Sequence, residues 1–293
     1  MRPTCPHCPK TSVSHEQEQH SVRIGYFYRK SDSRRIQRFR CLKCKRTYSR
    51  ATSHLCYHQN KRHKNEPLRK LLCSGVSLRR SARLLHLSRT TVARKLIFLG
   101  REAQRIFTAR NQAHSLSQII EFDDLETFEH SKCKPISVTM AVEHRSRRIL
   151  GFTVASMPAK GLLTAKALKK YGRRPDHRRA QRKALFAKLQ QQVLPFAEIK
   201  SDQNPHYPAL LKEYFPKALH RTFKGRRGCV TGQGELKQGG FDPLFSLNHT
   251  YAMLRANINR LFRKTWCTTK KMHRLEDHIA IYANYHNELV LEK

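Results

Sequence analysis

The chain has 293 residues, of which 59 are Lys or Arg and only 21 are Asp or Glu, so its formal charge is +38. An excess of this size favours a nucleic-acid partner over a small metabolite, because phosphates neutralise it. No apolar run reaches the roughly 18 residues that cross a bilayer, and the opening residues MRPTCPHC contain no apolar signal segment. We therefore expect no membrane partner and a cytoplasmic, nucleoid-associated protein.

Two CxxC pairs stand out in the first 50 residues, and they comprise Cys5, Cys8, Cys41 and Cys44. Four thiolates in this pattern suit a closed tetrahedral Zn²⁺ site, and so small a segment would scarcely fold without a metal. Strands are expected at residues 22–28 and 36–40, on either side of a polar turn. The sequence thus predicts a zinc ribbon over residues 1–52, with structural cysteines that bind no metal as the alternative.

Residues 65–99 change to helical periodicity, with Gly75 ending a first helix. Ser77 is placed to cap a second helix and Ser88 a third. The third helix would present polar and basic side chains to a DNA groove or to phosphates, namely Ser88, Arg89, Thr90, Thr91, Arg94 and Lys95. We predict a helix-turn-helix DNA-binding domain over residues 64–100, although any basic three-helix unit would share the pattern.

A different pattern begins after residue 111, where apolar strands alternate with helices. Strands are predicted at 119–124, 136–143, 149–155, 197–200 and 218–223, and helical segments at 162–171, 176–194 and 205–214. Three strands, helix, strand, helix, strand is the order of the ribonuclease H-like fold, in which the first and fourth strands are neighbours. We predict an α/β multi-domain protein whose residues 115–290 form a ribonuclease H-like, mixed-sheet catalytic domain.

Acidic residues concentrate in IIEFDDLETF, residues 119–128, which contains Glu121, Asp123, Asp124 and Glu126. In a chain so poor in acids this cluster indicates a divalent cation, the alternative being ion pairs with nearby Arg and Lys on an edge strand or turn. Asp202 also ends a short apolar strand. Two aspartates at the ends of neighbouring strands can share metal ions in a phosphoryl-transfer site. Because side chains alternate along a strand, only one of Asp123 and Asp124 should reach it.

The last third of the chain opens with a Gly-rich basic stretch, residues 224–241, that lacks a GK[ST] phosphate loop. We interpret it as a mobile loop on DNA. A helix at residues 243–266 carries a continuous apolar stripe, and its other face places Asn248 and Arg255 two turns apart. A final helix is predicted at residues 272–285.

The motifs CPHC, RCLKC, EFDDLETF, KSDQNPHYP and NHTYAMLRANINRLFRKTW together resemble the DDE-type insertion-sequence transposases that have an N-terminal zinc ribbon and helix-turn-helix. The resemblance extends over nearly the full length. It implies that Asp123 and Asp202 bind Mg²⁺ or Mn²⁺, and that Arg255 holds DNA phosphates. Similar transposases carry an acidic third ligand on the long helix, where this chain has Asn248. Glu235 is the nearest spare carboxylate, so either residue is a candidate.

The resemblance further implies a DNA transposase that cuts and joins the ends of an insertion element. Its partner would be double-stranded DNA at the element ends and at the target. Bringing two ends together favours a homodimer or a higher oligomer. The missing Glu keeps open a catalytically weak or inactive transposase-derived regulator that binds a specific DNA sequence, and a structure-selective nuclease on the same fold is a further alternative.

Overall fold

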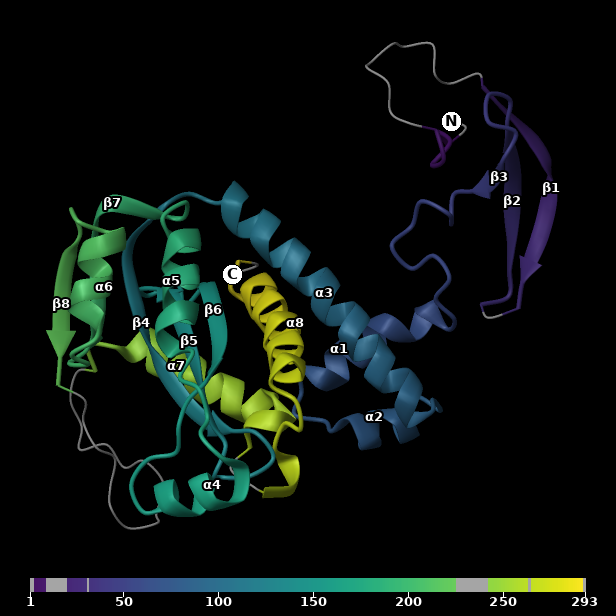
Figure 1. The fold of residues 1–293 in the computed structure, drawn as a ribbon. Helices are drawn as coiled ribbons and strands as arrows, with labels where there is room; N and C mark the ends of the chain where they lie inside the picture. The colour runs from purple at the N-terminus through teal and green to yellow at the C-terminus, as the bar shows by residue number, and fades with distance from the viewer. Residues whose placement is uncertain (1–2, 9–19, 31, 225–241, 263–264, 292–293) are drawn as a thin grey trace. The chain divides into compact units, whose positions relative to one another are not determined.

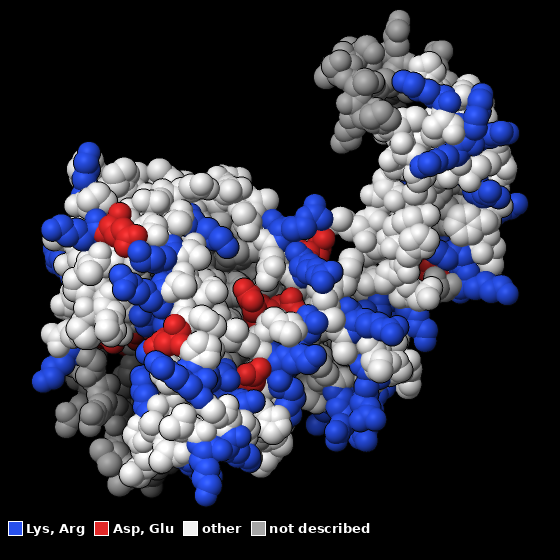
Figure 2. Space-filling view, in the orientation of Figure 1, with Lys and Arg blue, Asp and Glu red and all other residues white. Residues whose placement is uncertain are grey.

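The computed structural model describes residues 3–8, 20–30, 32–224, 242–262 and 265–291. The chain forms two compact units, Met1–Pro67 and Leu68–Lys293 (Figure 1). Lys and Arg side chains cover much of the visible surface of each unit, whereas Asp and Glu gather in a few places (Figure 2). None of the described helices has the length and apolar character that crossing a membrane requires.

The first unit is a small antiparallel sheet, in the order β1-β2-β3. Its strands are β1 Ser21–Arg29, β2 Arg34–Cys41 and β3 Thr47–Ser49, and a short 3-10 helix Arg62–Lys64 follows. The core consists of little more than Phe39 and Tyr48, whose ring centroids lie 5.8 Å apart, packed against the four cysteines. A core this small leaves much of the folding free energy to other sources such as a bound metal.

Three helices follow, namely α1 Asn65–Leu72, α2 Leu78–Leu84 and α3 Arg89–Ala113. Both predicted N-caps are present: the Ser77 hydroxyl accepts the backbone N–H of Arg80, and the Ser88 hydroxyl accepts that of Thr91. α3 continues far beyond the predicted end near residue 99. Its Gly100 lies against α8 (Met272–Leu291), where an added Cβ would come within 2.6 Å of the Asp277 Cβ. α3 therefore packs with α1 and α2 and also against the core of the second unit.

The central feature of the second unit is a five-stranded mixed sheet in the order β6-β5-β4-β7-β8. Its strands are β4 Ser117–Phe128, β5 Pro135–Glu143, β6 Ile149–Ser156, β7 Val193–Asp202 and β8 Leu219–Phe223. β4, β5 and β6 pair antiparallel, while β7 runs parallel to both β4 and β8. The predicted α/β class with a mixed sheet is confirmed. The acidic strand β4 lies in the centre of this sheet, so the alternative of an acidic edge strand is wrong.

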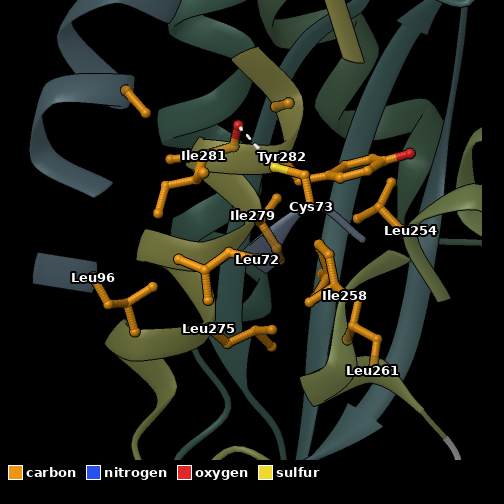
Figure 3. Packing of buried hydrophobic residues seen from close by; sticks show 14 of the residues in the cluster. Leu72, Cys73, Leu96, Leu254, Ile258, Leu261, Leu275, Ile279, Ile281 and Tyr282 are labelled. Carbon is orange, nitrogen blue, oxygen red and sulfur yellow. Dashed lines mark hydrogen bonds between the residues drawn. The ribbon is translucent and has the colours of Figure 1, made fainter. Parts of the chain in front are cut away.

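Helices cover both faces of this sheet (Figure 1). α5 Arg178–Leu189 and α6 Tyr207–Tyr214 pack on one face, where Phe122 contacts Phe186 and Tyr207. α7 Phe245–Asn257 and α8 Met272–Leu291 pack on the other face, and α4 Leu163–Tyr171 follows β6. On this second face, Leu72 of α1 and Cys73, which directly follows α1, lie among apolar side chains of α8 and of the end of α7 (Figure 3).

Two predicted helices end earlier in the structure than the sequence suggested. The segment predicted to be helical to residue 194 stops at Leu189, and Val193 already begins β7. The helix predicted over 243–266 ends at Asn257, because the Asn257 carbonyl accepts the N–H of Gly75 at 2.7 Å and Ile258 adopts an extended conformation. The described residues after Asn257 in that segment form the short 3-10 helices Asn259–Leu261 and Thr265–Cys267.

Candidate functional site

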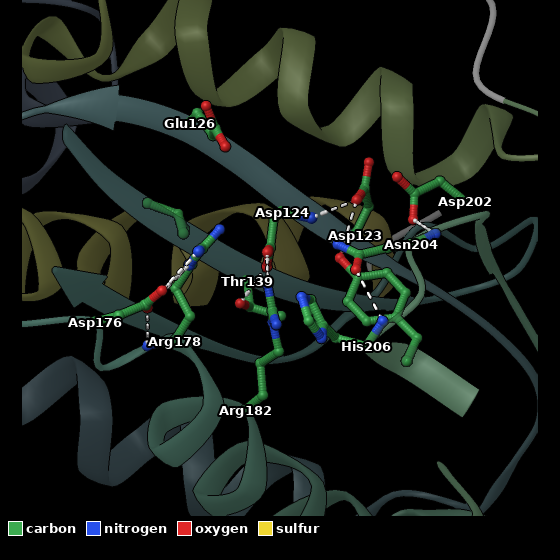
Figure 4. A network of polar contacts seen from close by, with 12 residues as sticks. Asp123, Asp124, Glu126, Thr139, Asp176, Arg178, Arg182, Asp202, Asn204 and His206 are labelled. Atoms are coloured by element: carbon green, nitrogen blue, oxygen red, sulfur yellow. Dashed lines mark hydrogen bonds and ion pairs between the residues drawn. The ribbon is translucent and has the colours of Figure 1, made fainter. Parts of the chain in front are cut away.

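Asp123 and Asp202 lie level with each other on adjacent parallel strands. β4 and β7 pair in register with Glu121 opposite Lys200, so the two aspartates follow two residues later on each strand. Their carboxylates point to the same side of the sheet (Figure 4). The predicted neighbourhood of the first and fourth strands is what brings these two side chains together.

The first acid of the cluster, Glu121, serves the fold. Its side chain is fully buried, and one carboxylate oxygen accepts the backbone N–H of Leu247 at 2.8 Å. Leu247 lies in the first turn of α7, where free N–H groups and the helix dipole favour a negative charge. The other oxygen lies 2.5 Å from Nδ1 of His144. Glu121 therefore fastens the start of α7 to the central strand.

Two further acids of the cluster also have partners of their own. Asp124 faces α5, where it accepts hydrogen bonds from the Arg182 guanidinium and the Thr139 hydroxyl. This is the sheet face opposite to that of Asp123, as strand alternation predicts (Figure 4). Glu126 is exposed and pairs with Lys160, whose Nζ lies 2.7 Å away. Ion pairing thus accounts for these two carboxylates without a metal.

The pair formed by Asp123 and Asp202 is different, because within the described residues neither carboxylate forms an ion pair. Asp123 accepts the backbone N–H of Asp124 at 2.6 Å and the Tyr207 hydroxyl at 3.2 Å. Asp202 accepts the backbone N–H of Asn204 at 3.1 Å. These contacts fix the positions of both groups but leave their charges without a cation.

The electrostatic result is an unfavourable pair of charges. Burial, followed by the charge of Asp202, raises the pKa of Asp123 from 3.8 to about 7. Burial and the charge of Asp124 raise the pKa of Asp202 as well. Such shifts mean that the fold holds two carboxylates in a place where their ionised forms are disfavoured. A divalent cation between them would relieve that cost.

We expect Asp123→Asn to stabilise the protein at pH 8 in buffer free of divalent cations. Because the pKa of Asp123 is higher in the folded than in the unfolded protein, the free energy of unfolding falls as pH rises from 3.8 to about 7. Once Asp123 is fully ionised, the free energy of unfolding is lower by about 2 to 4 kcal/mol, which corresponds to roughly 4 to 10 °C in melting temperature. An asparagine oxygen still accepts the two hydrogen bonds, so only the charge is removed.

The measurement is a pair of thermal melts at pH 8 and pH 5, with and without Mg²⁺. The advantage of the variant should shrink at pH 5, where Asp123 is protonated in the folded wild type. Added Mg²⁺ should raise the melting temperature of the wild type alone. A variant that melts below the wild type at pH 8 would contradict this electrostatic assignment.

The predicted third ligand, Asn248, lies on the exposed side of α7. Its amide nitrogen donates to Asp242 at 2.9 Å, rather than to either aspartate of the pair. Within the described chain, no third His, Cys, Asp or Glu joins Asp123 and Asp202 in a compact cluster. Arg255 follows two turns later on the same helix, and Glu235 lies outside the described residues. Two carboxylates are a donor set that Mg²⁺ accepts when substrate phosphates complete its shell.

The four predicted zinc ligands do come together. The Cys5 and Cys44 sulfurs lie 3.6 Å apart, the Cys8 and Cys41 sulfurs lie 3.7 Å apart, and all four lie within 4.8 Å of one another. A tetrahedron with Zn–S bonds of about 2.3 Å has edges of about 3.8 Å. The cysteines therefore fit one zinc ion, as the two CxxC pairs predict.

The predicted DNA-contacting side chains on α3 are mostly accessible. Arg89, Thr90 and Arg94 are exposed, while Ser88 uses its hydroxyl in the N-cap. Lys95 is an exception, since it is only 2% exposed. It follows Val92 by three residues on the helix and so falls on the same buried side. Its predicted contact with DNA is wrong.

Three residues of the site were not predicted from the sequence. Arg182 neutralises Asp124, and the hydroxyls of Tyr207 and Tyr251 hold Asp123, Tyr251 through the backbone carbonyl. Tyr207 lies in the motif KSDQNPHYP, five residues after Asp202, so its place near the acid carried a local signal. Tyr251 likewise lies in the motif NHTYAMLRANINRLFRKTW, three residues after Asn248, whereas Arg182 lies in none of the quoted motifs.

The site is thus defined by an aspartate pair that forms no ion pair with any described residue, on the adjacent strands β4 and β7 of a mixed sheet. A scan against protein-family models and a search of curated proteins both find no match to this chain.

Proposed function

We propose that this chain is a DDE-type DNA transposase that cuts and joins the ends of an insertion element. The observation that carries the proposal is the pair Asp123 and Asp202, level on adjacent strands and lacking any ion pair in the described structure. Every other carboxylate of the acidic strand has a protein partner. A pair left without one is placed as ligands for a divalent cation would be.

The topology supports the same proposal. Three antiparallel strands followed by two parallel strands, in the order β6-β5-β4-β7-β8, agree with the ribonuclease H-like architecture that we propose for this unit. A duplex partner is supported by the charge of +38 and by the exposed basic residues at the start of α3, Arg89 and Arg94. Phosphate contacts by such residues position a duplex without reading its sequence.

In the proposed reaction, the side chains of this unit position the cation and the DNA. Asp123 and Asp202 would hold a Mg²⁺ ion, which would supply the positive charge that phosphoryl transfer needs. Tyr207 and the backbone N–H of Asp124 keep the Asp123 carboxylate oriented. Arg255 would hold the phosphates of the strand being cut. A water would attack the phosphodiester at the element end and break its P–O3′ bond, which releases a 3′-OH. This 3′-OH would then attack a phosphate of the target strand and displace the 3′ oxygen of that strand.

Asn248 would be the weakest ligand of the three, because an amide oxygen is neutral and binds a hard cation more weakly than a carboxylate. Its amide nitrogen donates to Asp242, and within the described residues no contact joins its amide oxygen to the aspartate pair. This favours, as the second candidate, a regulator that binds DNA without cutting it.

The experiment is a strand-transfer assay on the DNA ends of its own element, with Mg²⁺ or Mn²⁺. We expect joined products from the wild type, a decrease of about tenfold or more for Asn248→Ala, and retained activity for Asn248→Glu. Specific duplex binding without any cation-dependent cutting would favour the regulator. Cutting without joining would favour a nuclease.

A further inference from the structure

The hairpin of β1 and β2 leaves large aromatic side chains in water. Tyr26 is 56% exposed, Tyr28 is 60% exposed, and Phe27 between them is also exposed. They lie outside the core of Phe39, Tyr48 and the cysteines. Three consecutive exposed aromatic residues on one strand are unusual for a surface with no binding role.

The two tyrosines share one face of this hairpin with a cation. Tyr26 pairs with Gln37 and Tyr28 pairs with Arg35, and residues directly opposite in an antiparallel pair point to the same side. The Arg35 guanidinium lies over the Tyr26 ring, 5.0 Å from its centroid. Gly25, with φ of +101°, forms the bulge that precedes Tyr26 and resets the alternation of the strand.

A basic groove of about 450 Å³ adjoins this face. Its described lining includes Tyr26 and no acidic residue, and its cations are Arg23, Arg35, Arg50 and Arg62. Asp32, at the nearby turn, is already held by Arg29 and by Arg62. The surface is therefore aromatic and positively charged, which matches a polyanion with flat apolar rings.

We propose that Tyr26, Tyr28 and Arg35 form a binding surface for an unpaired DNA strand. Exposed aromatic rings stack on unpaired bases, whereas the bases of a duplex already stack on each other and offer only their edges. The groove cations would hold the phosphates of the same strand. This inference rests on the proposed function, because cutting and joining expose unpaired bases at the element ends.

The test measures binding of the full, zinc-loaded chain to fluorescent oligonucleotides at about 0.15 M salt. The probes are an oligo(dT) strand of about 20 nucleotides and a duplex of equal length. The variant Tyr26→Leu with Tyr28→Leu should lose about tenfold or more in affinity for the single strand. Its affinity for the duplex should change by less than about twofold.

Two further variants separate stacking from general damage. Tyr26→Phe with Tyr28→Phe keeps both rings and should bind the single strand as the wild type does. Phe196→Leu is the matched control in the other unit, since Phe196 is 75% exposed with the Lys217 ammonium 5.5 Å from its ring centroid. It should bind both probes normally. A loss of bound zinc identifies any variant whose small sheet has unfolded. If the leucine variant unfolds, the comparison of Tyr26→Phe with Tyr28→Phe against the wild type tests the proposal instead.

The proposal is overturned if the leucine variant loses affinity equally for the single strand and the duplex, or loses none for the single strand. It is also overturned if the wild type binds an oligo(rU) strand more tightly than oligo(dT). The measurement is made in the Asp202→Asn background without Mg²⁺, so it does not depend on the aspartate pair. A negative result here leaves the proposed cutting and joining intact. Conversely, a chain that never cuts DNA can still pass this test.

Discussion

Asp123→Asn and Asp202→Asn should each lower cation-dependent cutting of DNA by about 10³-fold or more. Each substitution keeps the size and the hydrogen-bond acceptor of the side chain but removes the negative charge that, in the proposed function, binds the cation. Loss of a ligand from a phosphoryl-transfer site removes several kcal/mol of transition-state stabilisation. The rate is measured as the cleavage of labelled element ends under single-turnover conditions in Mg²⁺.

The matched control is Glu126→Gln, on the same strand as Asp123. Glu126 is exposed and only pairs with Lys160 on the surface, an interaction of small value. Its removal should leave the rate within about twofold of the wild type. If both asparagine variants cut as fast as this control, the aspartate pair is not the catalytic site.

Cys44→Ser should remove the zinc and unfold the small sheet of the first unit. Among the described residues its core is little more than Phe39 and Tyr48 packed on the four cysteines, so a bound zinc ion would supply most of the folding free energy, about 10 kcal/mol or more in comparable zinc sites. Zinc content should fall from about one ion per chain to none. Nuclear magnetic resonance spectra or limited proteolysis should then show that residues 20–50 are unfolded.

Cys56→Ser is the control for this experiment. Cys56 belongs to the same unit but not to the cysteine tetrad, and its sulfur accepts only a long hydrogen bond from Asn65 at 3.5 Å. This variant should keep its zinc and its fold. A Cys44→Ser chain that retains a protected sheet without zinc would show that the cysteines are structural and bind no metal.

Local signals in the sequence were sufficient for the elements that they specify. Ser77 and Ser88 cap their helices because a hydroxyl at that position satisfies a free backbone N–H. The strands predicted at 136–143 and 149–155 correspond closely to β5 and β6, since each is a buried apolar run bounded by polar turns. The two CxxC pairs likewise predicted a cysteine tetrad, which the structure places within one cluster.

Features that depend on distant contacts could not be predicted in this way. The apolar stripe of the helix predicted over 243–266 continues past Asn257. The helix nevertheless ends there, because the backbone N–H of Gly75, which is distant in the sequence, donates to the Asn257 carbonyl. Lys95 is a different case, because its three-residue spacing from Val92 was visible in the sequence and already placed it on the buried side, although its charge suggested the DNA surface. Arg182 is invisible as the partner of Asp124 until the sheet and α5 are assembled.

The aspartate pair itself lies between these two cases. The strand order predicted that Asp123 and Asp202 would be neighbours, and the structure places them level on β4 and β7. That the other acids of the strand are each paired could not be read from the sequence, because their partners come from α5, α7 and the segment after β6. This selection among neighbouring carboxylates is what makes the pair a candidate metal site.

The most direct measurement is Mn²⁺ binding to the full, zinc-loaded chain by electron paramagnetic resonance, in the wild type, Asp123→Asn, Asp202→Asn and Glu126→Gln. We predict a Mn²⁺ site that the wild type and Glu126→Gln share and that each of the other two variants loses. Binding of Mn²⁺ with the same affinity and stoichiometry in all four proteins would contradict a cation site at Asp123 and Asp202.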